Sequence, residues 1–138
     1  MSDAPFSLCL RVYMEDTDSG GIVYYVNYLK FMERARTEFM RSLGFGRDYI
    51  FNHDLMFVVR DVALRYRSPA RLDDELTATA TVSSLGGASI VFRQQVRRGE
   101  EELVGGDITV ACVDRQGVKA RRLPPDVVSR VRSTLPLT

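Results

Sequence analysis

The sequence has 138 residues, about the length of one domain. Hydrophobic residues make up 45% of it, enough for a substantial core, and charged residues make up 27% and nearly cancel to a net charge of +1. This balance disfavours nucleic acid as the main partner, because a surface that follows phosphates carries a basic excess. No apolar run approaches the ~20 residues of a membrane-spanning helix, and the N-terminus lacks the basic and apolar regions of a signal peptide. The sequence therefore predicts a single domain over residues 1–138, acting in the cytoplasm.

The N-terminal part of the sequence predicts a strand, a turn and a long helix. Residues 7–14 alternate between apolar and polar side chains, which is typical of a half-buried strand. The sequence EDTDSGG (15–21) has the composition of a turn. Apolar residues then recur with a period of 3.6 over residues 25–43, and a glycine follows them. This segment therefore predicts an amphipathic helix of about five turns.

The rest of the sequence predicts four strands and a short helix. A loop over residues 44–54, with the only histidine, His53, leads into four β-rich segments separated by short turns. These segments cover residues 55–67, 75–85, 89–98 and 102–114. Two adjacent glycines, 105–106, lie within the last segment and predict a bulge or a sharp bend. Residues 124–135 begin with two prolines and predict a closing helix.

This order of elements restricts the architecture. Short connections favour antiparallel strands, and a helix with one apolar stripe needs a sheet to cover it. The predicted fold class is α+β, with a curved antiparallel sheet of about five strands wrapped around the long central helix. Cys9 and Cys112 fall within two of the strands and are expected to be reduced thiols. The sheet would leave an edge unpaired, and association of two chains would protect it, so we expect a homodimer or homotetramer.

The acidic turn before the helix has three interpretations. As a calcium loop counted from Asp16 it would have Gly21 at its sixth position, but Asn27 replaces the glutamate needed at the twelfth. As a solvated turn, its acids would complement the dipole of the following helix. As a catalytic turn, Asp18 would attack a carbonyl or activate a water, while free N–H groups at the helix start, near Tyr25, polarise that carbonyl.

Several motifs of the chain resemble those of one enzyme family. The segment RVYMEDTDSGGIVYYVNYLKFMERAR (11–36) resembles the signature of hotdog-fold acyl-CoA thioesterases of the 4-hydroxybenzoyl-CoA thioesterase type. The sequences FVVRDVALRYRSPARLDDEL, SIVFRQQV, VACVD and RRLP follow in the same order and resemble the subfamily associated with the Tol-Pal system of Gram-negative bacteria. The resemblance covers about residues 8–130. It implies a hotdog fold and hydrolysis of acyl-CoA or acyl carrier protein thioesters without a cofactor or metal, in the cytoplasm or peripherally at the inner membrane.

The resemblance also implies roles for individual residues. The second acid of the D-x-D-x-x-G motif is Asp18, the implied nucleophile or general base, and the Tyr25 backbone N–H would polarise the thioester carbonyl. Many subfamily members have histidine at the position of Tyr25, so no role is implied for its side chain. The turn SLGGAS lacks the basic residues that hold coenzyme A phosphates in 4-hydroxybenzoyl-CoA thioesterase. The expected substrate-binding residues are Tyr28, Val58 and Val59 along the acyl slot, and Arg67, Ser68 and Arg71 toward the phosphates.

Alternatives to this interpretation stay open at the level of sequence. Glu33 is a rival catalytic acid, although it lies about 12 Å along the helix axis from Tyr25 at ~1.5 Å per residue. The same domain would also serve as a non-catalytic scaffold that binds acyl-CoA or acyl carrier protein in membrane lipid metabolism. Hydration of an enoyl thioester is a further alternative, but dehydratases of this fold pair a histidine with an acid, and His53 lies outside the motif. Short aliphatic, long aliphatic and aromatic acyl groups are all compatible with the sequence.

Overall fold

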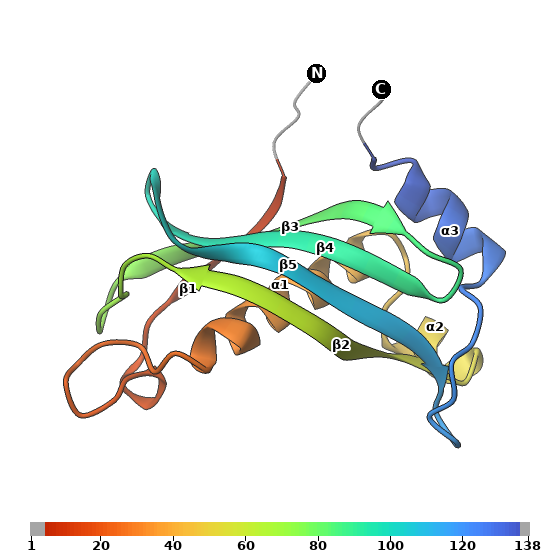
Figure 1. Cartoon of the computed structure of the whole chain (residues 1–138), viewed down its shortest axis with the longest axis horizontal. Helices are drawn as coiled ribbons and strands as arrows, with labels where there is room; N and C mark the ends of the chain where they lie inside the picture. The colour runs from red at the N-terminus through yellow and green to blue at the C-terminus, as the bar shows by residue number, and fades with distance from the viewer. Residues whose placement is uncertain (1–4, 136–138) are drawn as a thin grey trace.

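The computed structural model describes residues 5–135, and its main feature is one five-stranded antiparallel sheet (Figure 1). The strand order is β1-β3-β4-β5-β2, so β1 and β2 form the two edges. The strands are β1 (Phe6–Arg11), β2 (Leu55–Tyr66), β3 (Glu75–Leu85), β4 (Ser89–Arg98) and β5 (Glu101–Asp114). The five predicted strands and their antiparallel pairing are confirmed.

Helix α1 (Asn27–Ser42) packs on one face of the sheet against β1, β3 and β4 (Figure 1). It buries a stripe spaced at helical intervals that includes Phe31, Ala35 and Phe39, and these side chains meet Phe92 and other residues of the sheet. The predicted helix over residues 25–43 is thus confirmed in its register. Its start is two residues later, because Tyr25 and Val26 belong to a turn.

The predicted loop over residues 44–54 was wrong, because it contains the short helix α2 (Arg47–Asn52). Six residues make less than two turns, too few for a helical period to show in the sequence. Tyr49 and Ile50 of α2 pack against the core, and their burial holds a helix that local propensity alone would not form.

The first strand and the last helix are both shorter than the sequence patterns predicted. The first strand ends at Arg11, because the chain turns into the 3₁₀ helix η1 (Met14–Asp16) before the acidic turn is complete. The closing helix α3 covers Pro125–Arg132 and buries Val127 and Val131 against the core.

The bulge predicted at the glycine pair of β5 was wrong. Both glycines keep a continuous register with β2 on one side and β4 on the other. Instead, Gly106 is needed for space, because a Cβ there would lie 2.0 Å from the carbonyl oxygen of Ala63, and its φ is +156°. The register of β2 shifts elsewhere, between Val59 and Asp61. The glycine therefore allows two backbones to approach closely without breaking the ladder.

Gly106→Ala tests this close approach. The added methyl group would meet backbone atoms of β2 at a φ unfavourable to alanine, so we expect a loss of about 2 kcal/mol or more in the free energy of unfolding. Gly117→Ala is the matched control, because a Cβ there would meet only the Lys119 side chain at an ordinary 3.7 Å. Urea denaturation of both variants measures the difference, and equal stabilities would contradict the argument.

The outer edge of β2 is a second feature that the sequence pattern predicted only in general terms. Within residues 5–135, β2 pairs with β5 alone, so the backbone groups along its other side have no strand partner. Val59, Val62 and Tyr66 of this strand are each 45–49% exposed. A long unpaired edge with exposed apolar side chains is typical of a surface that a second chain covers. No helix in the described part of the chain is long and apolar enough to span a membrane.

Candidate active site

The acidic turn is anchored to the rest of the molecule through Asp16, which is only 7% exposed. One carboxylate oxygen accepts the Tyr13 N–H at 2.9 Å, and the other accepts the side-chain amide N–H of Asn27 at 2.9 Å. The Asp16 carbonyl also accepts the Tyr24 N–H at 3.0 Å. Asp16 thus ties the turn to the first residue of α1 and holds the turn in shape.

Asp18 is exposed, and the turn fixes its position. Its Oδ1 accepts the Gly20 N–H at 2.8 Å, and its own N–H donates to the Ile22 carbonyl at 2.9 Å. Gly21 adopts a φ of +81°, which glycine tolerates, and donates its N–H to the Asp18 carbonyl at 3.1 Å. Within residues 5–135 the second carboxylate oxygen of Asp18 accepts no hydrogen bond, so it faces solvent and is free to act on a ligand.

Tyr25 lies two residues before α1 and is 60% exposed. Its backbone N–H has no acceptor in the described part of the chain, as expected for an N–H group at a helix start. Its carbonyl accepts the Tyr66 hydroxyl at 3.2 Å, which holds Tyr25 against the end of β2. A free N–H group at a helix start and an exposed carboxylate on the preceding turn are the kinds of group that acyl transfer uses.

The turn between β2 and β3 packs against the acidic turn and contains the residues expected to meet the coenzyme. The Val23 N–H donates to the Ala70 carbonyl at 2.9 Å, and Ile22 forms an antiparallel bridge with Arg71. The Ala70 N–H in turn donates to the Tyr28 hydroxyl at 2.9 Å. Tyr28 is 2% exposed, so its side chain belongs to the core of the single chain, and this burial raises its pKa although the Ala70 N–H opposes the shift.

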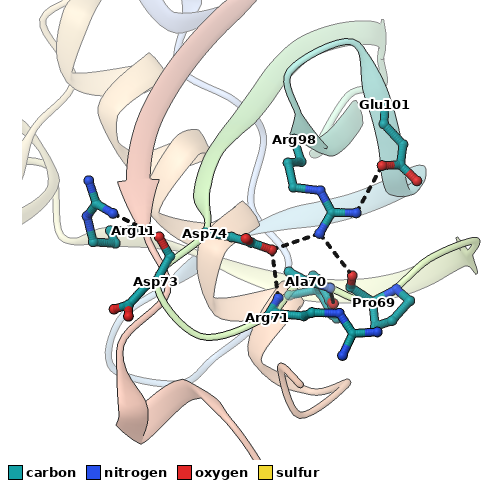
Figure 2. A network of polar contacts seen from close by, with 9 residues as sticks. Arg11, Pro69, Ala70, Arg71, Asp73, Asp74, Arg98 and Glu101 are labelled. Atoms are coloured by element: carbon teal, nitrogen blue, oxygen red, sulfur yellow. Dashed lines mark hydrogen bonds and ion pairs between the residues drawn. The ribbon is translucent and has the colours of Figure 1, made fainter. Parts of the chain in front are cut away.

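Asp74 holds this second turn in shape (Figure 2). Its Oδ2 accepts the Arg71 N–H at 2.8 Å and an Arg98 guanidinium N–H at 2.7 Å. Arg98 also donates to Glu101 at 2.9 Å and to the Pro69 carbonyl at 3.4 Å. Burial alone would raise the pKa of Asp74, but the hydrogen bonds from Arg71 and Arg98 outweigh it and lower the pKa.

Asp74→Ala should therefore loosen the turn that supports the acidic turn. We expect a loss of about 1–2 kcal/mol in the free energy of unfolding at pH 7, the scale of hydrogen bonds to a partly exposed charged group. Because the folded-state pKa is depressed, this contribution is present above the unfolded pKa of about 3.9 and disappears as the pH falls through the folded value.

The control is Glu75→Ala, which removes an exposed ion pair with Arg11 and should change stability by less than about 0.5 kcal/mol. Thermal unfolding of both variants between pH 3 and pH 7 gives the comparison. A difference between Asp74→Ala and the parent chain that is the same at both pH values would contradict the assignment to a charged carboxylate.

Val58 and Val59 line a cavity of about 610 Å³ that lies between the second half of α1, α2 and the first half of β2. Most of its wall is apolar and includes Met40, Phe45 and Ile50, which no motif in the sequence marks as site residues. Neither Asp18 nor Tyr25 lines it. In Figure 1 the acidic turn and α2 lie at opposite ends of α1. A single chain therefore separates the expected acyl-slot residues from the expected reacting groups.

The remaining expected residues differ in how they are engaged. Arg67 forms an ion pair with Glu102 at 2.9 Å, and the Ser68 N–H donates to the Leu103 carbonyl at 3.2 Å. The exposed guanidinium of Arg71 makes no hydrogen bond or ion pair within residues 5–135. His53 stacks on Tyr49 at the far end of α2, away from the acidic turn. In the described residues no three His, Cys, Asp or Glu side chains gather as metal ligands would, and both cysteines are free.

Comparison with known proteins gives a consistent family. The sequence profile of the Thioesterase superfamily matches residues 20–105. The acyl-CoA thioester hydrolase YbgC of Escherichia coli is 39% identical over 133 residues, which is 96% of this chain and 99% of that protein. The acyl-CoA thioesterase YbgC of Haemophilus influenzae is 43% identical over 128 residues, which is 92% of this chain and 94% of that protein.

Solved structures share the fold. A probable thioesterase from Bartonella henselae has a TM-score of 0.83 and 37% identity, covering 88% of this chain and 100% of that one. The protein SAV2348 from Staphylococcus aureus, solved in complex with CoA, has a TM-score of 0.88 over 100% of this chain and 90% of its own. Its identity is 13%, so this second likeness concerns the fold alone.

Proposed function

Because the chain belongs to the thioesterase superfamily, we propose that it hydrolyses the thioester bond of acyl-CoA substrates with Asp18 and the Tyr25 N–H as its reacting groups. The observation that carries the proposal is the pairing of a free backbone N–H with an exposed carboxylate on one anchored turn. Two relatives that are 39% and 43% identical over nearly the whole chain are named as acyl-CoA thioester hydrolase and acyl-CoA thioesterase, which supports the substrate class.

The chemistry follows from the two groups. The Tyr25 N–H donates to the thioester oxygen and stabilises the negative charge that develops on it. In one route an Asp18 oxygen bonds to the carbonyl carbon, the carbon–sulfur bond breaks, and water then hydrolyses the anhydride. In the other route Asp18 takes a proton from a water, which attacks the carbonyl carbon while the thiolate leaves and is protonated. Both routes yield a free acid and a thiol and need no other reactant than water.

A second copy of the chain completes the site in this proposal. The centre of β2 lies between Arg60 and Asp61, so a two-fold axis there pairs the outer edges of two β2 strands in antiparallel fashion. Tyr66, at one end of β2, would then lie opposite the partner's Leu55 at the other end. Since Tyr66 contacts Tyr25, the reacting groups of one chain would reach the cavity of the other. The dimer would also cover the exposed valines and tyrosines of this face.

The coenzyme and the setting complete the proposal. Arg71 lies beside the acidic turn with a free guanidinium and is the proposed contact for a coenzyme A phosphate, with Ser68 next to it, whereas Glu102 already engages Arg67. The motif resemblance supports a single hotdog domain of the Tol-Pal-associated subfamily. It also supports action in the cytoplasm or at the inner membrane, with acyl carrier protein as an additional substrate carrier and a tetramer as a further assembly.

Asp18→Asn should abolish most thioesterase turnover and leave the fold intact. The amide keeps the shape of the side chain but cannot act as a base or nucleophile, so we expect a loss of about two decades or more in kcat. Glu15→Gln, an exposed acid of the same segment, is the control and should stay near wild type. The assay is thiol release from a panel of short, long and aromatic acyl-CoA esters. Near-normal turnover of Asp18→Asn, with Glu33→Gln inactive instead, would overturn the assignment.

Tyr25→Phe should reduce kcat by less than about tenfold, because the proposed contribution comes from the backbone N–H, and this group is unchanged when phenylalanine replaces tyrosine. The substitution removes only the hydroxyl group, and the ring keeps its contacts with Tyr24 and Tyr66. The same thiol-release assay measures it. A loss as large as that of Asp18→Asn would show that the hydroxyl takes part in the reaction.

The active unit should be at least a dimer. Light scattering and sedimentation at assay concentration should give a mass of twice the 15.6 kDa of one chain, or a multiple of that dimer. Dilution below the dissociation constant should reduce specific activity in parallel with the dimer fraction, because each site needs two chains. A fully active monomer would contradict the shared site and would place the acyl slot within one chain.

A further inference from the structure

One buried cation forms no ion pair within residues 5–135. Arg36, on α1, is 8% exposed and donates from Nη1 to the Gln94 side-chain oxygen at 2.9 Å. Gln94 is fully buried, and its amide nitrogen donates to the Met32 carbonyl at 3.0 Å and the Thr79 carbonyl at 2.9 Å. This fixes the Gln94 oxygen toward Arg36. Within residues 5–135 no carboxylate lies within 4.0 Å of the Arg36 guanidinium, and a buried cation without an anion is costly.

The nearest acid on the same helix is Glu33, one turn earlier. It is exposed and forms no ion pair in the described part of the chain. Burial lowers the pKa of Arg36, and the negative charge of Glu33 partly opposes this. Both side chains line a cavity of about 210 Å³ together with Lys30 of α1 and Val59 and Val62 of β2, and both also line the neighbouring cavity of about 610 Å³. Glu33 and Arg36 therefore face the side of the molecule where the outer edge of β2 is unpaired.

In a two-fold symmetric dimer, the directions of α1 and β2 determine which residue of the second chain lies near Arg36. Helix α1 and β2 run in opposite directions, since Tyr66 meets Tyr25 at one end and the middle of β2 lies over Glu33 and Arg36. The midpoint of α1 falls between Arg34 and Ala35, so Glu33 and Arg36 lie equally far on either side of it. A two-fold axis beside the outer edge of β2, level with Val59 and Val62 and with the midpoint of α1, would place each Glu33 at the height of the partner's Arg36.

We infer that Glu33 of each chain forms an ion pair with the partner's Arg36, giving two identical pairs across the axis of the dimer. The inference rests on the proposed function, because it assumes the shared site described there. It assigns Glu33 a positioning role: the pairs fix the register of the two helices and so align Tyr25 with the partner's cavity. In this inference Arg36 acts through Gln94 and the ion pair, and Glu33 acts through the ion pair, so neither is assigned a step of the reaction.

The decisive experiment exchanges the charges between two separately purified variants. Glu33→Arg alone places like charges opposite each other, and so does Arg36→Glu alone, so each variant should dimerise at least about tenfold more weakly than wild type. In a mixture of the two, a heterodimer has an acid opposite a base at both positions. We expect mixing to restore the dimer and the turnover, measured by light scattering, by co-elution of a tagged with an untagged chain, and by thiol release.

The matched control is Glu38→Arg, which makes the same charge change on the same helix but removes a pair with Arg41 inside one chain. It should dimerise like wild type and should not associate preferentially with Arg36→Glu. If the folded variants Glu33→Arg and Arg36→Glu do not associate on mixing, the inference is wrong. Dimerisation of Glu33→Arg as tight as wild type would overturn it equally.

A second measurement covers the case in which Arg36→Glu does not fold, because its carboxylate would face the fixed oxygen of Gln94. Glu33→Arg changes an exposed side chain and should keep the wild-type circular dichroism spectrum. Its weakened dimerisation should recover partly in high salt, which screens the repulsion. A lack of salt dependence would contradict the inference.

The outcomes also separate this inference from the proposed function. A wild-type chain that is active as a monomer would refute the shared site itself. A dimeric wild type with an equally dimeric Glu33→Arg would refute the ion pair alone. An intact Glu33→Arg dimer that has lost turnover would place Glu33 or Arg36 against the acyl group and would likewise refute the pairing.

Discussion

The carboxylate of Asp16 is the group on which the candidate site depends. It is buried, it accepts one hydrogen bond from the chain that enters the turn and one from Asn27 at the start of α1, and its backbone carbonyl accepts a third from Tyr24. These bonds join the acidic turn to the helix as one unit. The exposed carboxylate of Asp18 and the free N–H of Tyr25 lie on that unit, so their relative position is set before any ligand arrives, which is the condition for electrostatic stabilisation of a developing oxyanion. The two acids of the motif therefore differ in their surroundings, because Asp16 is buried and bonded whereas Asp18 is exposed.

The turn between β2 and β3 supports this unit from the other side. Asp74 and Arg98 hold that turn through charge-assisted hydrogen bonds, and its Ala70 carbonyl receives the Val23 N–H just after the glycines. The Ala70 N–H also donates to the buried Tyr28 hydroxyl. Hydrogen bonds therefore connect the turn between β2 and β3 both to the core and to the acidic turn. The guanidinium of Arg71 lies on this same turn between β2 and β3, so a phosphate bound there would be positioned by the groups that position the Asp18 carboxylate.

The outer edge of β2, which has no strand partner within residues 5–135, bears on how the proposed site is divided. The proposed reacting groups lie at one end of α1, and the apolar cavity with Val58 and Val59 lies at the other. A two-fold operation about the middle of β2 exchanges these ends, so the same association that would cover exposed apolar surface would also bring carboxylate and cavity together. The buried Arg36, whose fixed partner Gln94 is neutral, lies near the centre of that face.

The sequence by itself determined the five strands, the register of α1, the turn and the family, because each rests on local signals: a period of two or 3.6, turn residues, and an ordered set of motifs. The motif resemblance implies that Asp18 is the reacting acid, and this stays a prediction. Tertiary structure alone decided the rest. Helix α2 exists because Tyr49 and Ile50 find a core to pack on, and Gly106 is required by a strand that arrives from forty residues earlier in the chain. Asp18 lies away from the cavity, and Arg36 lies buried against the neutral Gln94. Both facts depend on which edges and faces of the elements meet, and residue spacing along the chain does not predict this.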